Sequence, residues 1–261
     1  IREDVGDGDH SSLACIPIEA EGKAKLLVKD NGVIAGVEFA KNVFNYIDRD
    51  LKVEVLIEDG NNVKYGDIVF YVSGSSQSKL KAERLVLNSI QRMSAIATKT
   101  KQFVDLLEGT GTKILDTRKT TPGIRALEKW AVKIGGGENH RFALYDMIML
   151  KDNHIDFAGG ITKAISKTKK YLIDTKKDLK IIVEARNLNE IEEILKSEAF
   201  CPPSITDSKG AKSKFQNPSL LSSHIVKSSG IPVSTFPEML NSNSSVLKQP
   251  VTSSVALTNI V

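Results

Sequence analysis

Apolar residues recur at helical spacing between residues 79 and 107, and this pattern predicts the longest helix of the chain. At about 100° per residue, one broad face is apolar and the opposite face is polar. The apolar face carries Leu85, Val86, Met93, Ile96, Ala97, Phe103, Val104 and Leu107. The polar face carries Arg84, Asn88, Gln91 and Thr98. Residues 37–47 predict a second amphipathic helix by the same spacing.

The first part of the chain alternates short apolar runs with turns. Residues 25–28 and 53–57 predict strands, and glycine-containing turns follow both of them. Residues 1–12 are acidic and rich in turn residues, which favours a capped surface turn. A metal site there is the less favoured interpretation, because no second ligand cluster is spaced to join it.

After residue 110, three short apolar runs each end at a charged residue. Residues 113–115 precede Asp116, 147–150 precede Lys151, and 180–183 precede Glu184. One helix is expected between the first two runs, beginning at Thr121-Pro122 and ending at a left-handed Gly135. Two more helices are expected later, at residues 159–172 and 187–195. This alternation is typical of a parallel α/β fold, in which function collects at the carboxyl ends of the strands.

Cationic side chains are concentrated between residues 111 and 155, around a triple-glycine turn at residues 135–137. These cationic residues are Arg118, Lys119, Arg125, Lys133, His140, Arg141 and Lys151. Their density favours a pocket for a small, heavily anionic substrate. The glycines are interpreted first as a helix terminator and second as a phosphate cradle. They do not form a Walker loop, because no Gly-Lys-Ser/Thr follows.

Composition excludes several other classes of protein. The 261 residues are 41% hydrophobic and 26% charged, which is typical of a globular chain. A net charge of +4, with lysines spread over expected helix faces, favours solvated surfaces over nucleic-acid binding. No apolar run reaches the length of a membrane span. Cys15 and Cys201 lie far apart, so a reduced, cytoplasmic protein is expected. The chain opens at Ile1 directly in a motif, and we expect a preceding segment to be missing.

Four segments carry a family resemblance: REDVGDGDHSS, ERLVLNSIQRMSAIAT, DTRKTTPGIRALEKWAVKIGGGENHR and LKDNHI. Together they resemble the quinolinate phosphoribosyltransferases (nicotinate-nucleotide pyrophosphorylases, carboxylating), from about Arg2 to about Leu195. The resemblance implies an N-terminal α/β sandwich domain over residues 1–108, including the long helix. An α/β barrel of the type II phosphoribosyltransferase kind follows over residues 109–199, and its closure is not assured. Residues 200–261 depart from the family as a divergent or disordered tail.

The resemblance also implies an activity. These pentosyltransferases of de novo NAD biosynthesis join quinolinate to phosphoribosyl pyrophosphate (PRPP) with Mg²⁺, and release nicotinate mononucleotide, pyrophosphate and CO₂. The substrate-binding residues implied here are Arg84, Arg118, Lys119, Thr120, His140, Arg141, Lys151 and Glu184. Lys119 and Glu184 are the implied catalytic residues. Arg84 is expected to reach the pocket of a partner subunit, which makes a homodimer with a shared active site the expected assembly.

Alternative roles remain open for individual residues and for the substrate. Arg118 and Arg141 could instead pair structurally with Asp116 or Asp146. His140 and His154 both follow an asparagine and could cap turns; His140 is assigned to the pocket and His154 is left between the two roles. A mono-acid such as nicotinate is the alternative substrate, but three arginines together favour the diacid.

The tail after Leu195 changes character. From Phe200 to Val261 it holds six of the chain's eight prolines and only two acids, Asp207 and Glu238. The family would place here a strand ending in Leu-Asp-Asn, a Ser-Gly-rich phosphate loop and a Gly-Ala-Leu-Thr turn. Residues 228–230 and 253–258 are faint echoes, with Val255 where a glycine is expected. We therefore expect a shifted reading frame or a strongly diverged end. The missing second acid leaves the metal ligands unassigned, and a catalytically impaired relative that keeps the diacid pocket is the alternative function.

Overall fold

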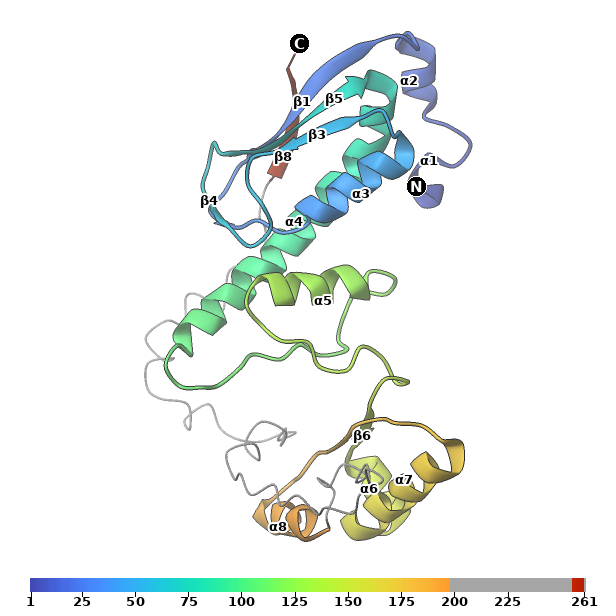
Figure 1. Cartoon of the computed structure of the whole chain (residues 1–261), viewed down its shortest axis with the longest axis vertical. Coiled ribbons are helices and arrows are strands. Elements are labelled where there is room, and N and C mark those ends of the chain that lie inside the picture. Colours follow the sequence, from blue (N-terminus) through green and yellow to red (C-terminus); the bar gives the residue numbers. More distant parts are fainter. Residues whose placement is uncertain (198–254, 261) are drawn as a thin grey trace, which may run out of the picture. The chain divides into compact units, whose positions relative to one another are not determined.

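A computed structural model describes residues 1–197 and 255–260, which form two compact units (Figure 1). The first unit contains Ile1–His140 together with the strand at residues 255–260, and the second contains the described residues from Arg141 onward. Each unit is described by itself. The predicted domain boundary between residues 108 and 109 lies just after the long helix and remains a prediction.

The first unit is built on a four-stranded antiparallel sheet in the order β3-β5-β1-β8. Its strands are β1 (Glu21–Val28), β3 (Lys52–Val55), β5 (Ile68–Ser75) and β8 (Val255–Ile260). In β1, Ala24, Leu26 and Val28 are buried while the residues between them are not, as the period of two requires. Two further short strands pair with each other, β2 (Gly32–Val33) and β4 (Asn62–Val63). The strands predicted at residues 25–28 and 53–57 are therefore confirmed in β1 and β3.

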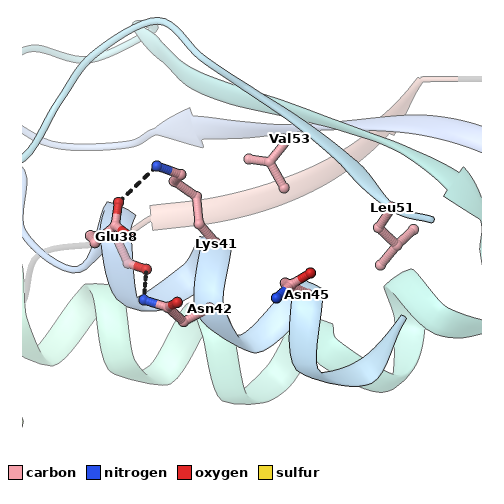
Figure 2. Close-up of a pocket in the computed structure, with 6 residues that line it drawn as sticks. All are labelled: Glu38, Lys41, Asn42, Asn45, Leu51 and Val53. Atoms are coloured by element: carbon pink, nitrogen blue, oxygen red, sulfur yellow. Dashed lines mark hydrogen bonds and ion pairs between the residues drawn. The ribbon is translucent and has the colours of Figure 1, made fainter. Parts of the chain in front are cut away.

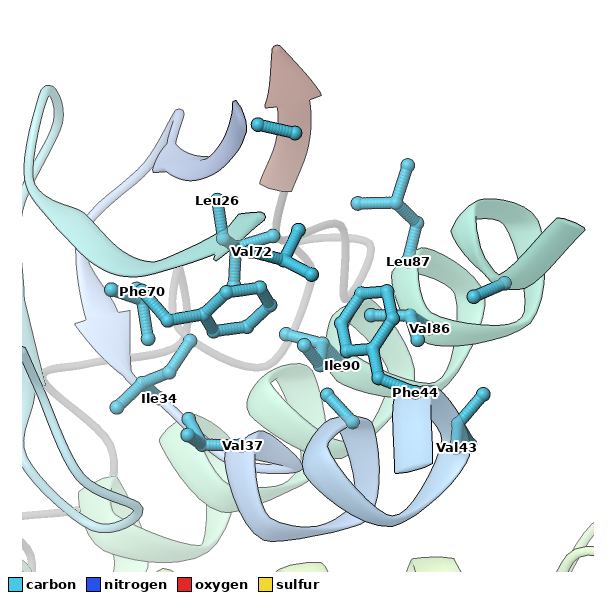
Figure 3. Packing of buried hydrophobic residues seen from close by; sticks show 14 of the residues in the cluster. Leu26, Ile34, Val37, Val43, Phe44, Phe70, Val72, Val86, Leu87 and Ile90 are labelled. Carbon is cyan, nitrogen blue, oxygen red and sulfur yellow. The ribbon is translucent and has the colours of Figure 1, made fainter. Parts of the chain in front are cut away.

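Two helices cover one face of this sheet. They are α3 (Val37–Ile47) and α4 (Ser76–Leu106), and both helices predicted from their apolar spacing are confirmed. Figure 3 shows the core between the sheet and these two helices. There Phe44 of α3 and Phe70 of β5 meet edge to face, with ring centroids 6.0 Å apart. Ile90 of α4 is also fully buried in this cluster. The apolar face of the long helix thus builds the core of the first unit.

The segment predicted as a capped surface turn contains two short helices, α1 (Arg2–Val5) and α2 (His10–Cys15). The capping residue is Asp9, whose carboxylate accepts a hydrogen bond of 3.2 Å from the backbone N–H of Ser12. Hydrogen bonding to Ser12 lowers the pKa of Asp9 below its ordinary value. Among the acidic residues of this segment, Asp9 therefore serves as the cap of α2.

Helix α5 (Arg125–Ile134) packs on α4 in the first unit, but it begins later than predicted. Thr121 does not cap it, because its N–H and hydroxyl both bind the Glu128 carboxylate, at 3.0 and 2.8 Å. The strand expected at residues 113–115 is also wrong: only Leu115 forms an isolated parallel bridge, to Glu138. The left-handed glycine after the helix is Gly136, with φ of 89°, and not Gly135.

The second unit contains the predicted parallel pair of strands. They are β6 (Ile148–Leu150) and β7 (Ile181–Val183), and Leu150 lies opposite Val183. Three helices accompany them: α6 (Asp152–Ala158), α7 (Ile161–Thr175) and α8 (Leu188–Lys196). The helices expected at residues 159–172 and 187–195 are confirmed as α7 and α8, while α6 was not predicted. The described parts of the chain show an α/β protein, and no closed sheet occurs within them.

Most of the predicted tail, including residues 228–230 and Cys201, lies outside the described residues. The exception is β8, which runs antiparallel to β1 with Leu26 opposite Leu257. The faint echo of a barrel turn at residues 253–258 thus overlaps an edge strand of the first sheet. Among the described helices, none combines the length and apolarity needed to cross a bilayer.

Candidate active site

The strand ends of the second unit bring Lys151 and Glu184 together. Each is the first residue after a parallel strand, and the Lys151 Nζ lies 3.1 Å from a carboxylate oxygen of Glu184. The Glu184 side chain is only 8% exposed, whereas that of Lys151 is 46% exposed. The backbone N–H of Glu184 donates to the carbonyl of Leu150 at 2.9 Å, which fixes the two strand ends side by side. The expectation that charged residues gather at this edge is confirmed for this pair.

His154 caps the helix that follows Lys151. Its Nδ1 accepts a hydrogen bond of 2.9 Å from the backbone N–H of Lys151, at the start of α6. The sequence left His154 between a pocket role and a capping role, and the geometry gives it the capping role. By holding the backbone at Lys151, this contact fixes where the lysine side chain starts.

Arg141 is buried in the second unit, at 8% exposure, ahead of β6. One guanidinium nitrogen lies 3.5 Å from the carbonyl oxygen of Met147. The carboxylate of Asp146 accepts hydrogen bonds from the N–H groups of Phe142 and Ala143, at 2.6 and 2.7 Å. These contacts order the loop between Arg141 and the strand.

The Arg118–Thr120 segment lies in the first unit, in the loop before α5. Lys119 is exposed, and the Thr120 hydroxyl accepts a hydrogen bond of 3.0 Å from Nε of Arg125. Arg118 is half-buried, and its Nε atom is buried with no hydrogen-bond partner among the described residues. A buried guanidinium donor of this kind is a position at which an anion would supply the missing acceptor.

Asp116 organises the neighbourhood of His140, also in the first unit. Its carboxylate forms an ion pair with the ammonium of Lys129 and accepts a hydrogen bond of 2.8 Å from the backbone N–H of His140. The cationic partner of Asp116 is therefore Lys129, and the alternative pairing with Arg118 is wrong. Sequence analysis missed Lys129, because nothing in a lysine-rich helix separates a buried lysine from a solvated one.

Glu128, one residue earlier in α5, anchors the loop that contains Arg118. Its carboxylate binds Thr121 as described and also the Arg92 guanidinium, 2.8 Å away on α4. Burial opposes ionisation of Glu128, but the hydrogen bonds from Thr121 and Arg92 outweigh it and hold its pKa below the ordinary value. Sequence analysis missed this residue as well.

The triple glycine serves the packing of α5 on α4. A Cβ on Gly135 would lie 2.4 Å from the carbonyl oxygen of Ala97, and one on Gly137 would lie 2.9 Å from the Thr100 side chain. Gly136 supplies the left-handed backbone between them. Close approach to α4 therefore requires glycine here, and the helix-terminator interpretation is the one that the contacts support.

Arg84 lies on the exposed side of α4, as its place on the polar face predicted. Within the described residues it forms no hydrogen bond or ion pair. The pocket shown in Figure 2 lies elsewhere, between α3 and β3, and is lined by Glu38, Lys41, Asn42, Asn45, Leu51 and Val53. None of the predicted site residues lines it.

The described residues do not form a protein-held metal site. No group of three or more His, Cys, Asp or Glu side chains is placed to hold an ion within them. Of the two residues that directly follow β6 and β7, Glu184 carries the carboxylate, and it is already paired with Lys151. Mg²⁺ typically binds through one or two carboxylates together with substrate phosphates.

These features define a two-domain α/β protein of the type II phosphoribosyltransferase class. Residues 9–94 match the model of the quinolinate phosphoribosyl transferase N-terminal domain, and residues 96–204 match that of the C-terminal domain. The chain belongs to the quinolinate phosphoribosyltransferase family.

Curated relatives and solved structures agree with this assignment. Quinolinate phosphoribosyltransferase [decarboxylating] 1b of Nicotiana tabacum is 44% identical over 207 residues, which cover 79% of this chain and 59% of the relative. A probable nicotinate-nucleotide pyrophosphorylase [carboxylating] of Synechocystis is 40% identical over 198 residues, 76% of this chain and 66% of the relative. The crystal structure of NadC from Streptococcus pyogenes has a TM-score of 0.68 and 39% identity, covering 74% of this chain and 69% of that one. The chain thus spans less than two thirds of the length of the curated relatives.

Proposed function

We propose that this protein transfers the phosphoribosyl group of PRPP to quinolinate and decarboxylates the product. The reaction yields nicotinate mononucleotide, pyrophosphate and CO₂, a step of de novo NAD biosynthesis. The observation that carries the proposal is the Lys151–Glu184 pair at the ends of adjacent parallel strands, inside the region that matches the family. In this pair, Lys151 supplies a cation that can bind an anionic substrate. Glu184 supplies a carboxylate that can stabilise positive charge developing on the ribose.

Cationic side chains would bind the diacid. Planar guanidinium groups suit carboxylates because they donate two parallel hydrogen bonds, and an ammonium group serves as a point charge. We assign Arg118, His140, Arg141 and Lys151 to quinolinate. The buried Nε of Arg118 supports this, because the described residues offer it no acceptor. We assign Lys119 and Thr120, which follow Arg118 in the chain, to the phosphates of PRPP.

The chemistry follows the movement of charge. The bond between ribose C1 and the pyrophosphate oxygen breaks, its electrons leave with pyrophosphate, and positive charge grows on the ribose. Glu184 would stabilise that charge while Lys119 stabilises the departing phosphate. The quinolinate nitrogen then bonds to C1. The ribosylated ring accepts the electron pair left by CO₂, and a proton from water completes nicotinate mononucleotide.

Three further assignments belong to the proposal. Mg²⁺ would enter on the phosphates of PRPP, because this ion usually binds through one or two carboxylates together with substrate phosphates. A homodimer would allow the exposed Arg84 of one subunit to complete the pocket of the other. A cytoplasmic location is the third, although relatives from rice and tobacco carry the names chloroplastic and mitochondrial.

A second candidate function is a diacid-binding relative with impaired catalysis. The family match ends at residue 204, and the residues after it follow no family model. A chain of this kind would keep quinolinate affinity without turnover.

Turnover and binding measured together distinguish the two candidates. We expect the purified chain to form nicotinate mononucleotide from quinolinate, PRPP and Mg²⁺, and Arg118→Ala to abolish it. Arg49→Ala is the control, since Arg49 is an exposed arginine outside the predicted site. Quinolinate binding without product would support the impaired relative. If the chain neither binds quinolinate nor forms product, both candidate functions are overturned.

A further inference from the structure

A buried ion pair forms hydrogen bonds to both the backbone N–H and the backbone carbonyl of His140. The pair joins Asp116 to Lys129 of α5, and the two side chains are 6% and 3% exposed. The Asp116 carboxylate accepts the N–H of His140 at 2.8 Å, while the Lys129 ammonium donates to the carbonyl of the same residue at 3.3 Å. Both partners thus hold one peptide segment between them, entirely within the first unit.

The residue before His140 is held by the same pair. The neighbours of the Asn139 amide fix its orientation: with its nitrogen turned towards them, it donates to the second carboxylate oxygen of Asp116 at 2.8 Å and to the carbonyl of Lys129 at 2.9 Å. The backbone N–H of Asp116 donates to the carbonyl of Glu138 at 3.1 Å. Residues 138–140 are therefore fixed by contacts to Asp116 and α5 at each successive position.

A buried ion pair contributes less to the stability of the fold than its close contacts suggest. Removing two charges from water costs several kcal/mol for each ion, and well-packed apolar residues of similar volume are often at least as stabilising. Apolar residues, however, could neither accept the N–H of His140 nor donate to its carbonyl. The directional contacts are what this pair adds over a hydrophobic substitute.

We propose that Asp116 and Lys129 are positioning residues that set the place of His140 in the quinolinate pocket. This inference rests on the proposed function, because it takes His140 as a quinolinate ligand. Neither residue needs to touch the substrate. Their effect passes through the backbone of residues 138–140, so it falls on the diacid and leaves PRPP binding largely unchanged.

The double variant Asp116→Asn/Lys129→Met tests this without leaving a buried charge unpaired. Quinolinate affinity, measured by calorimetry in the absence of PRPP, should fall about tenfold to a hundredfold, as expected for a displaced ligand. The KM for quinolinate should rise in parallel, while the KM for PRPP changes less than about twofold. Thermal unfolding must remain cooperative.

An exposed ion pair between the same two segments provides a matched control. Lys113 and Glu138 form an ion pair whose side chains are 67% and 51% exposed. Lys113→Met/Glu138→Gln removes a pair between these segments without touching the backbone of His140. We expect wild-type affinity for quinolinate from this control.

If the buried double variant does not fold, Asn139→Ala replaces it, because Asn139 is exposed and carries no charge. A weakening of at least about threefold for quinolinate supports the positioning role. A folded variant with wild-type quinolinate affinity, or with both substrates weakened equally, overturns it. A wild-type chain that fails to bind quinolinate overturns the proposed function itself, and the positioning role with it. Wild-type binding without turnover overturns only the activity.

Discussion

Glu128 and Lys129 are neighbours on α5, yet they anchor different segments of the first unit. Glu128 binds Thr121, next to the Arg118–Thr120 segment, and Lys129 binds Asp116 and the carbonyl of His140. Both side chains are buried and they carry opposite charges. One short helix therefore fixes two groups of predicted substrate ligands.

Stability should depend on the ionisation of Glu128. Its pKa in the folded chain lies below the ordinary value of 4.5, so the carboxylate stabilises the fold above pH 4.5. That contribution is lost as the pH falls through 4.5 and then through the lower folded value. Glu128→Gln should cost about 1–3 kcal/mol at pH 7 and should lose less stability between pH 7 and pH 3.5. Urea unfolding at both pH values measures this, and equal losses in both proteins would refute it.

Alanine substitutions in the triple glycine should differ in cost. Gly135→Ala places a Cβ against the backbone of α4, and we expect about 3 kcal/mol of destabilisation from overpacking. Gly136→Ala meets only ordinary contacts with Val104, so its left-handed backbone should cost about 1 kcal/mol. Denaturant unfolding of the two variants gives the comparison. The reverse order would show that α5 does not pack on α4 as described.

Asp59 should stabilise the start of α3 from a distance in sequence. Gly36 precedes the helix and has no side chain to cap it, but the Asp59 carboxylate accepts the N–H groups of Gly36, Val37 and Glu38 at 2.7, 2.9 and 3.2 Å. Asp59→Ala should therefore lower the free energy of unfolding by about 1–2 kcal/mol. Asp30→Ala is the matched control, because Asp30 is exposed and, within the described residues, its side chain binds only its neighbour Asn31. Equal effects of the two variants would argue against the cap.

In an active chain, substitutions of Glu184 and Lys151 should affect catalysis and substrate binding differently. Glu184→Gln removes the carboxylate charge, and kcat should fall about a hundredfold or more while quinolinate still binds. Lys151→Met should weaken quinolinate and also destabilise the fold, because it leaves the buried Glu184 without its cation. Steady-state kinetics, binding and thermal unfolding are compared, with exposed Glu192→Gln as the control. An unchanged kcat in Glu184→Gln would remove Glu184 from the mechanism.

Local patterns in the sequence predicted most of the regular elements. The apolar spacing of α4 and α3 required no knowledge of their partners, and the apolar runs before Lys151 and Glu184 predicted the two strands that end at these residues. Such elements are set by periodicity, which a sequence shows directly.

The features that sequence analysis missed depend on contacts between distant residues. Thr121 is a suitable helix cap by its type, but the Glu128 side chain competes for it and α5 starts at Arg125. Lys129 looks like any solvated lysine until Asp116 is placed beside it. A residue type constrains its options, and tertiary neighbours choose among them.

The pairing of β8 with β1 affects how the first sheet folds. Lys23 lies opposite Ile260, so β1 takes its neighbour from residues that lie far later in the chain and are made after it. Until those residues leave the ribosome, one edge of β1 presents unpaired N–H and C=O groups that can recruit a strand from another chain. Pairing across such a sequence separation also slows folding. The interval between synthesis of β1 and arrival of β8 is therefore when this chain is most exposed to misassembly.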